Sequence, residues 1–188
     1  DHMSVYGYPR PTTPHIEKYA SEGTTFENAI APSSWTLPSH ATLFTGLYTY
    51  QHQATGERLH ERFLTLASAL KGRGYYTAGF VGNTSYAHAK TGLANGFVHY
   101  EDLFSSIGNA VVRTVYGRRI FPRVARAAGY YDELGRKRAE DVNREFLEWL
   151  DAPAGIPAAD LGHARPFFAF LNYFDVHTPY LPPLAYAA

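Results

Sequence analysis

The sequence predicts an α/β fold in which helices flank a mostly parallel sheet. Two short apolar runs, at 76–81 and 166–174, have the length and aromatic content of buried strands. Helical character precedes both: LTLASALKGRG lies at 64–74, and apolar residues at helical spacing cover 138–151. Helices that alternate with strands are typical of parallel sheets. We therefore expect the two runs to be neighbouring or near-neighbouring strands, with 166–174 a central strand buried on both faces.

The other elements are predicted from turn formers and helix caps. A short helix is expected over HIEKYASEG, because Pro14 suits its first turn and a glycine follows its end. The alternating segment TTFENAIAP at 24–32 predicts a strand. A second helix is expected over PSHATLFTG, again between a proline and a glycine. Residues 92–104 are expected to form a loop and a short strand.

Residues 105–131 are predicted to be an inserted helical segment. Five arginines fall within it, and no acid appears before Asp132. The simpler interpretation is a solvated face of that insertion. The alternative is a surface that faces phosphate groups or a membrane.

The composition excludes several classes of partner and site. Seventeen basic residues balance seventeen acidic ones, so the net charge of zero provides no long-range field for nucleic acid. Without cysteine, the chain has no disulfide, thiolate ligand or cysteine nucleophile. No apolar run approaches the roughly 20 residues that span a bilayer. Localisation and any contact with a membrane are left open by the sequence.

Reactive side chains concentrate in two segments, SSWTLPSH and DVHTPY. Thr36 stands at a helix start, where N–H groups and the helix dipole favour an alkoxide or an anion, although threonine there is also a common cap. His40 is either a donor and proton carrier or a partly exposed helix histidine. Asp175 and His177 follow a strand, where they either converge on one metal or anion or form a turn. Open α/β sheets place ligands at this edge.

The order of several segments resembles the N-terminal half of sulfatases, within the alkaline-phosphatase superfamily. The matching stretches are TTPHIEKYASEG, FENAIAPSSWTLPSHATLFTG, ALKGRGYYTAGFVGN, GLANGFVHYEDLF and PFFAFLNYFDVHTPYLPP, and residues 105–131 match least. The resemblance implies that 1–188 is a partial sulfatase-like catalytic domain with an alkaline-phosphatase-like fold. That fold is expected to be incomplete, with the family's first strand upstream of Asp1 and its C-terminal half beyond Ala188.

The nucleophile loop is the most specific part of the resemblance. In sulfatases a Cys or Ser is followed by any residue and then by Pro-Ser-Arg, and here Thr36, Leu37, Pro38, Ser39 and His40 take these places. Sulfatases oxidise that Cys or Ser to formylglycine. Threonine carries a β-methyl group and cannot give the aldehyde, so no formylglycine is expected. A metal-bound threonine is the nucleophile of phosphodiesterase-type and phosphoglycerol-transferase-type members of the superfamily, and Thr36 resembles that variant.

Other family positions are altered in this chain. His40 replaces a permanently charged arginine with a titratable group. Gly82 and Asn83 stand where the family has its substrate-binding Lys and His, and the candidate substitutes are Asn83 and His88. His177 matches a family histidine that contacts the transferred anion, and Asp175 is a weaker match. The family's divalent ion is held by an Asp-Asp pair and by later residues, none of which the chain contains. The resemblance of Thr36 to the metal-bound threonine of other superfamily members implies that Thr36 is a metal ligand.

These interpretations combine into one functional expectation. The full-length protein is expected to be a sulfatase-like hydrolase of sulfate or phosphate esters that uses calcium, magnesium, manganese or zinc. Its substrate would be a sulfated or phosphorylated small molecule, glycan or lipid headgroup, and not nucleic acid. The chain alone is expected to be inactive, and the alternative is an inactive sulfatase-fold protein that binds an anionic ligand or partner. The catalytic candidates are Thr36, His40 and His177, and the substrate-binding candidates are Ser39, Asn83 and Asp175.

Overall fold

The computed structural model describes residues 2–102, 136–151, 166–178 and 180. The predicted insertion at 105–131 lies outside the described residues. The chain divides into two compact units, Asp1–Ala31 and Pro32–Ala188. None of the helices in the described ranges combines the length and the apolar character that a membrane crossing requires.

The first unit contains a short 3-10 helix, η1 (Ser4–Tyr6), and helix α1 (Pro14–Ser21). The helix begins at its proline, as predicted, because the missing N–H costs nothing in the first turn. The backbone N–H of Ser4 donates to the Thr13 hydroxyl at 3.1 Å, and the two hydroxyl oxygens lie 3.0 Å apart. These bonds tie η1 to the start of α1.

The strand predicted at 24–32 is wrong. This segment is irregular apart from one turn, and its large apolar side chains are exposed, Phe26 at 70% and Ile30 at 91%. An alternating pattern describes only which side chains suit a pleated surface, and a strand also requires a hydrogen-bonded neighbour. Among the described residues, this segment pairs with no strand.

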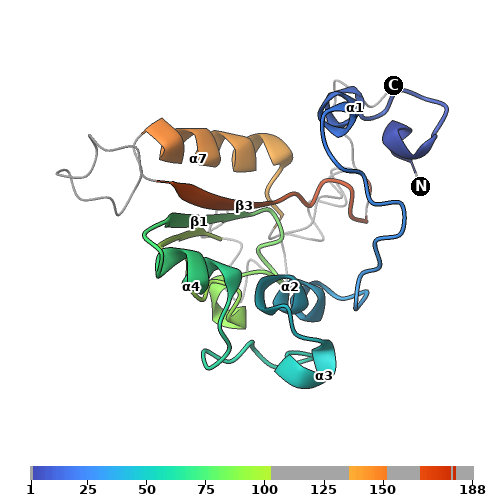
Figure 1. The fold of residues 1–188 in the computed structure, drawn as a ribbon. Coiled ribbons are helices and arrows are strands. Elements are labelled where there is room, and N and C mark those ends of the chain that lie inside the picture. The colour runs from blue at the N-terminus through green and yellow to red at the C-terminus, as the bar shows by residue number, and fades with distance from the viewer. Residues whose placement is uncertain (1, 103–135, 152–165, 179, 181–188) are drawn as a thin grey trace, which may run out of the picture. The chain divides into compact units, whose positions relative to one another are not determined.

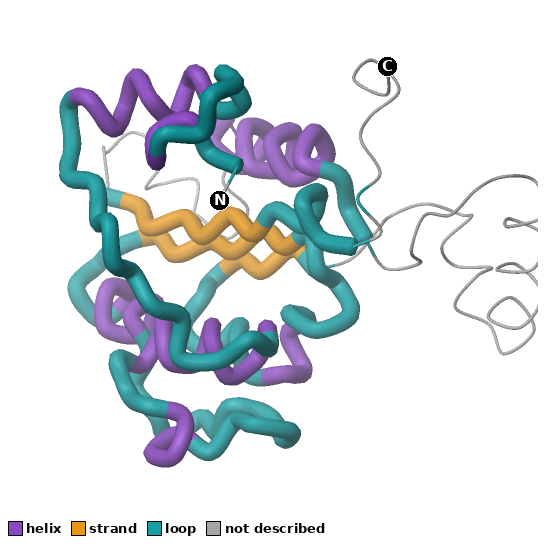
Figure 2. The backbone as a smooth tube through the Cα atoms, turned by 90° about the vertical axis from the view of Figure 1, so that its right-hand side faces the viewer, coloured by secondary structure: helices purple, strands orange, loops and turns teal. Residues whose placement is uncertain are grey.

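The second unit is built on a three-stranded parallel sheet (Figure 2). Its strands are β1 (Tyr76–Val81), β2 (His99–Glu101) and β3 (Phe167–Asn172), in the order β2-β1-β3. The pairing of β1 with β3 runs from Tyr76 opposite Phe167 to Val81 opposite Asn172. This pairing confirms that the two apolar runs are neighbouring parallel strands, and β2 is the short strand predicted within 92–104.

The central strand of the described sheet is β1, not β3 as predicted. Five of the six β1 residues are buried, whereas β3 is half-buried and Phe167 is 50% exposed. The difference follows from position, because β1 has a strand on each side and β3 has one described neighbour. Both sequences are predominantly apolar, so their composition does not distinguish centre from edge.

Helices cover both faces of this sheet (Figure 1). On one face, α7 (Ala139–Asp151) packs Val142 and Trp149 against Ala78 and Phe80 of β1. On the other face, the cluster that contains Val81 includes apolar residues of α2 (Thr36–Thr45), while α4 (Leu66–Lys71) also contacts β1. Successive β1 residues therefore point to opposite layers, as a strand's pleat requires.

On the second face of the sheet, a glycine ends α2, and the side chain of His52 connects α2 to the helix that follows. The last turn of α2 leads into Gly46 at φ 69°, a left-handed conformation that suits glycine. A four-residue helix that was not predicted, α3 (Thr49–His52), follows. His52 is 2% exposed, its Nδ1 accepts from the Ala54 N–H at 3.0 Å, and its Nε2 lies 3.0 Å from the Thr42 hydroxyl. His52 therefore joins α3 to α2.

Gly82, just past β1, is a point of close backbone approach in the second unit. Its N–H donates to the Asn172 carbonyl at 2.7 Å, and its carbonyl accepts from the Lys137 N–H at 2.9 Å. A Cβ atom here would lie 2.9 Å from the Asn172 oxygen and 3.2 Å from the Lys137 oxygen. Only glycine lets the end of β3 and segment 136–137 come this close.

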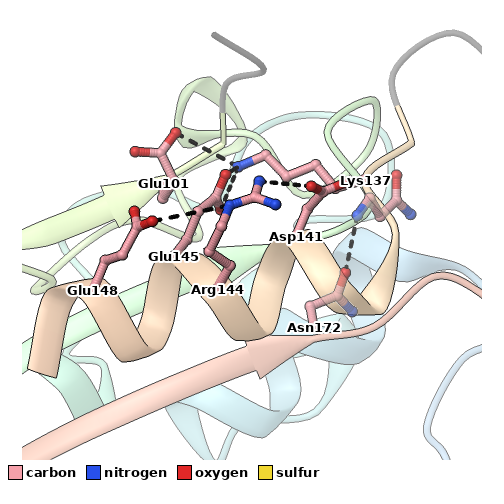
Figure 3. A network of polar contacts seen from close by, with 8 residues as sticks. Glu101, Lys137, Asp141, Arg144, Glu145, Glu148 and Asn172 are labelled. Carbon is pink, nitrogen blue, oxygen red and sulfur yellow. Dashed lines mark hydrogen bonds and ion pairs between the residues drawn. The ribbon is translucent and has the colours of Figure 1, made fainter.

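A buried lysine holds segment 136–137 from the other side (Figure 3). Lys137 is fully buried, and its Nζ lies 2.7 Å from a carboxylate oxygen of Glu145 on α7 and 3.5 Å from Glu101 on β2. A lysine buried so deeply is costly unless it is paired. The two carboxylates therefore fix the segment between β2 and α7.

We expect Gly82→Ala to destabilise the chain by about 1–3 kcal/mol, because the added methyl group meets backbone atoms that cannot yield. Gly56→Ala is the matched control, since a Cβ there meets nothing within 4 Å and should cost nothing or give a small gain. Urea unfolding of the 188-residue chain measures both. Equal stability of the two variants would contradict the close approach.

The buried His52 predicts a loss of stability in acid. Burial lowers its pKa below the ordinary 6.5, so the unfolded chain binds this proton more readily than the folded one. The contribution of neutral His52 to the free energy of unfolding is therefore intact above about pH 6.5. It is lost as the pH falls toward the lowered pKa of the folded chain. Burial also lowers the pKa of His99. In urea titrations from about pH 7.5 to 5.5, His52→Gln should weaken the pH dependence of the free energy of unfolding, and the exposed control His60→Gln should not. The same pH dependence in both variants would contradict this role of His52.

Candidate active site

Thr36, the nucleophile candidate, is the first residue of α2 and does not cap it. The N-cap position belongs to Trp35, and no side chain makes a capping bond there. The Thr36 hydroxyl instead accepts a hydrogen bond from the Asn83 side-chain amide at 3.3 Å. Asn83 is itself buried directly after β1. The loop at the helix start and the carboxyl end of β1 thus meet at the Thr36 oxygen.

A closed ring of hydrogen bonds extends from this contact. The Asn83 N–H donates to the side-chain oxygen of Asn172, the last residue of β3, at 3.2 Å. The Asn172 amide nitrogen lies 3.5 Å from Nε2 of His40, a long hydrogen bond. Nδ1 of His40 lies 2.7 Å from the Thr36 carbonyl oxygen, which closes the ring. Thr36, His40, Asn83 and Asn172 are therefore one connected unit, called the Thr36 ring below.

The partners in the Thr36 ring determine the tautomer of His40. The Thr36 carbonyl can only accept, so Nδ1 carries the proton. The Asn172 side-chain oxygen already accepts from Asn83, so its NH₂ group faces Nε2, which must accept. His40 is neutral in this arrangement, and both of its nitrogens are engaged away from the Thr36 hydroxyl.

Asp175 and His177 belong to a second group, arranged around the buried Phe174. The His177 ring stacks on Phe174 at 4.2 Å between centroids, and the Arg136 guanidinium lies over the same ring at 5.9 Å. Nη2 of Arg136 donates to the Asp175 carbonyl at 2.8 Å. A backbone bridge pairs Arg136 with Asn83, which connects this group to the Thr36 ring.

Two buried atoms of the second group lack hydrogen-bond partners among the described residues. They are Oδ2 of Asp175 and Nη1 of Arg136. His177 is exposed, and its Nδ1 donates to the Thr178 carbonyl at 2.7 Å, which leaves Nε2 as the other ring nitrogen for a ligand. Ser39 is half-buried on α2, where its N–H donates to the Trp35 carbonyl at 3.2 Å, and it joins neither group.

Sequence reasoning missed two residues of this site, Asn172 and Arg136. Asn172 had a signal, because a polar side chain closes an otherwise apolar strand at the edge where ligands bind. Arg136 had none, since no motif surrounds it and its contacts are made only in three dimensions. From their places in the sequence, we predict that Thr36 and His177 face one cleft, with their side chains within about 10 Å of each other.

The residues of this site do not form a metal centre by themselves. No group of three or more His, Cys, Asp or Glu side chains is placed to hold an ion within the described ranges. Two oxygens have the right chemistry for a divalent ion, the Thr36 hydroxyl and Oδ2 of Asp175. A complete coordination sphere would need ligands from outside the described residues.

The Thr36 ring predicts that His40 carries its proton on Nδ1 when neutral. Long-range ¹H–¹⁵N correlation spectra of the 188-residue chain, labelled at histidine and recorded above about pH 8, distinguish the two tautomers. His40→Gln assigns the signal. Asn172→Leu removes the donor to Nε2 and should weaken the tautomer preference, whereas a proton found on Nε2 in the unaltered chain would contradict the ring.

Comparison with known proteins identifies relatives of the chain. The sequence model of the family described as Sulfatase matches residues 1–188. An N-acetylgalactosamine-6-O-sulfatase of Bacteroides thetaiotaomicron is 37% identical over 87 residues, which is 43% of this chain and 17% of that protein. The multifunctional alkaline phosphatase superfamily protein PehA of Trinickia caryophylli is 26% identical over 204 residues, which is 94% of this chain and 38% of that protein.

Two solved structures share the fold and confirm the predicted alkaline-phosphatase-like class. A phosphonate monoester hydrolase of Agrobacterium radiobacter gives a TM-score of 0.64 at 21% identity, over 99% of this chain and 40% of that one. The C-terminal periplasmic domain of EcEptC from Escherichia coli, in complex with Zn, gives 0.57 at 17% identity, over 98% and 43%. The chain spans less than half the length of each of these relatives. Because the family match runs from residue 1 to residue 188, the chain belongs to the sulfatase family.

Proposed function

We propose that the full-length protein hydrolyses or transfers a phosphate or sulfate ester, with Thr36 as its nucleophile. The observation that carries this proposal is the Thr36 hydroxyl, which starts a ten-residue helix without capping it and is held by the Asn83 amide at 3.3 Å. N–H groups at a helix start favour negative charge, both on an attacking oxygen and on the group it attacks. The relatives support the same class of chemistry, since they are a sulfatase, an alkaline phosphatase superfamily protein and a phosphonate monoester hydrolase.

The proposed reaction proceeds through a covalent intermediate on Thr36. Its oxygen forms a bond to the phosphorus or sulfur atom and loses its proton, while the bond to the ester oxygen breaks and that oxygen leaves with the electron pair and a proton. Attack by water or another hydroxyl then releases the group and restores the threonine. The Asn83 amide donates toward the oxygen on which charge develops, a contact that favours the deprotonated form.

The remaining candidates are assigned by the contacts they make. We assign His177 to the transferred anion, with Nε2 as the atom that meets it, because Nδ1 is engaged with the Thr178 carbonyl. His40 positions Thr36 through its carbonyl and meets substrate only if the bond to Asn172 opens. Ser39 and Asp175 are assigned to substrate binding, and the Asp175 carboxylate would have to meet a donor or a cation rather than the anion itself.

A divalent ion is part of the proposal for the full-length protein. Calcium, magnesium, manganese and zinc are the candidates, and one of the solved relatives is a complex with Zn. Such an ion would supply positive charge beside Thr36 and the transferred group. The substrate is proposed to be a sulfated or phosphorylated small molecule, glycan or lipid headgroup.

Anion binding without turnover is the second candidate function. It is favoured by one observation: in the described part of the chain, the Thr36 hydroxyl has no basic partner, since its one hydrogen bond comes from an amide. A nucleophile without a base or a metal is weak. Turnover therefore decides between the two functions.

Thr36→Ala should lower turnover by about 10³-fold or more in the full-length protein, for whichever ester it hydrolyses, because the variant lacks the oxygen that is proposed to form the intermediate. Initial rates with bis(4-nitrophenyl) phosphate, 4-nitrophenyl phosphate and 4-nitrophenyl sulfate measure the loss. The exposed Thr55→Ala serves as the control and should be unaffected. Quenched single-turnover samples should carry the transferred group on Thr36 by peptide mass spectrometry. Undiminished turnover by the alanine variant would sink the proposal, and binding of these esters without any turnover would favour the second candidate.

A further inference from the structure

Arg136 is a buried cation with an unused donor. The residue is 7% exposed, and of its terminal nitrogens Nη2 donates to the Asp175 carbonyl at 2.8 Å. Nη1 is buried and has no hydrogen-bond partner within the described residues. A guanidinium has five N–H donors, and burying its charge without satisfying them is costly. A buried arginine in this state is suited to a ligand that brings negative oxygens.

The acidic residues near Arg136 do not neutralise it. Its contact with Asp175 is to the backbone carbonyl, and within the described ranges no carboxylate oxygen lies within 4.0 Å of the guanidinium. Its neighbour Lys137 differs, because two carboxylates surround it. The exposed Arg144 on α7 is likewise paired, with Asp141 at 2.6 Å. The fold thus supplies carboxylates to nearby cations and leaves Arg136 without one.

The backbone that carries Arg136 is held rigidly beside the nucleophile. Lys137 is anchored by Glu145 and Glu101, and Gly82 has no side chain to keep the segment away. The resulting bridge sets Arg136 opposite Asn83, whose side chain donates to the Thr36 hydroxyl. Asn83 therefore connects the two residues: its backbone pairs with that of Arg136, and its side chain bonds to Thr36.

We propose that Arg136 is an anion-binding residue of this site, whose Nη1 donates to an oxygen of the sulfate or phosphate group that Thr36 attacks. That this anion belongs to the ester attacked by Thr36 rests on the proposed function. That Arg136 binds an anion at all rests on the geometry alone. Guanidinium groups bind tetrahedral oxyanions well, because their planar donors match two oxygens and their charge does not titrate. His177 packs on the same Phe174 ring as Arg136, so the two proposed anion contacts are supported by one aromatic side chain.

The test measures binding of inorganic phosphate and of inorganic sulfate to the full-length protein, by calorimetry and by the shift in unfolding temperature, with chloride holding ionic strength constant. At least one of the two anions should bind and raise the unfolding temperature. Arg136→Met should weaken that binding by about tenfold or more. Arg136→Lys should weaken it by less, since a lysine keeps the positive charge but lacks the planar pair of donors. Arg144→Met, which removes an exposed arginine from α7, is the matched control and should bind as the unaltered protein does.

The outcomes separate this inference from the proposed function. If Arg136 only holds the fold together, Arg136→Met will lower the unfolding temperature in anion-free buffer and the folded fraction will still bind, which would overturn the inference. If that variant does not fold, Arg136→Lys decides, and affinity equal to that of the unaltered protein would overturn it. Binding of neither anion would also overturn it. Arg136-dependent binding without ester turnover would instead leave the anion site standing and remove the proposed function.

Discussion

The backbone contact at Gly82 is the constraint on which the site depends. At this residue the end of β1 bonds to the end of β3 on one side and to segment 136–137 on the other. Any side chain would meet backbone oxygens, and backbone cannot give way as a flexible side chain does. The next residue, Asn83, is therefore placed between Asn172 and Arg136, and its own side chain reaches the nucleophile candidate.

Two consecutive basic residues serve this arrangement in different ways. The charge of Lys137 is neutralised inside the protein by Glu145 and Glu101, so the Lys137 side chain links β2 to α7. Burial raises the pKa of Glu145, and the nearby Glu101 and Asp141 add to that rise, while the hydrogen bond and charge of Lys137 oppose it. Arg136, by contrast, has no carboxylate oxygen within 4.0 Å among the described residues, so no ion pair there neutralises its charge.

The fold could be predicted from the sequence further than the site could. Apolar runs and helical spacing identified β1, β3 and α7, because local pattern determines which segments bury a face. Pairing and sheet position depend on partners, so the strand predicted at 24–32 was wrong, and within the described sheet β1 is central instead of β3. The bond from Asn83 to Asn172 spans 89 residues, and no local pattern carries such a contact. Resemblance supplied Thr36, whereas Arg136 required the structure.

The charge of the Thr36 ring bears on how Thr36 would be activated. Its members are a hydroxyl, two amides and an imidazole whose hydrogen bonds require the neutral form, so the ring carries no charge. An amide donor alone favours an alkoxide too little to overcome the weak acidity of an aliphatic hydroxyl near neutral pH. The ring thus holds Thr36 as an aligned but protonated group. Positive charge from outside the ring has to lower the cost of losing that proton, and within the described residues Arg136 is the permanent cation whose backbone is bridged to the ring. An anionic ligand that engages Arg136 would use part of that charge, so arginine alone suits binding better than activation. In the proposed full-length site, a divalent ion would supply the remaining positive charge.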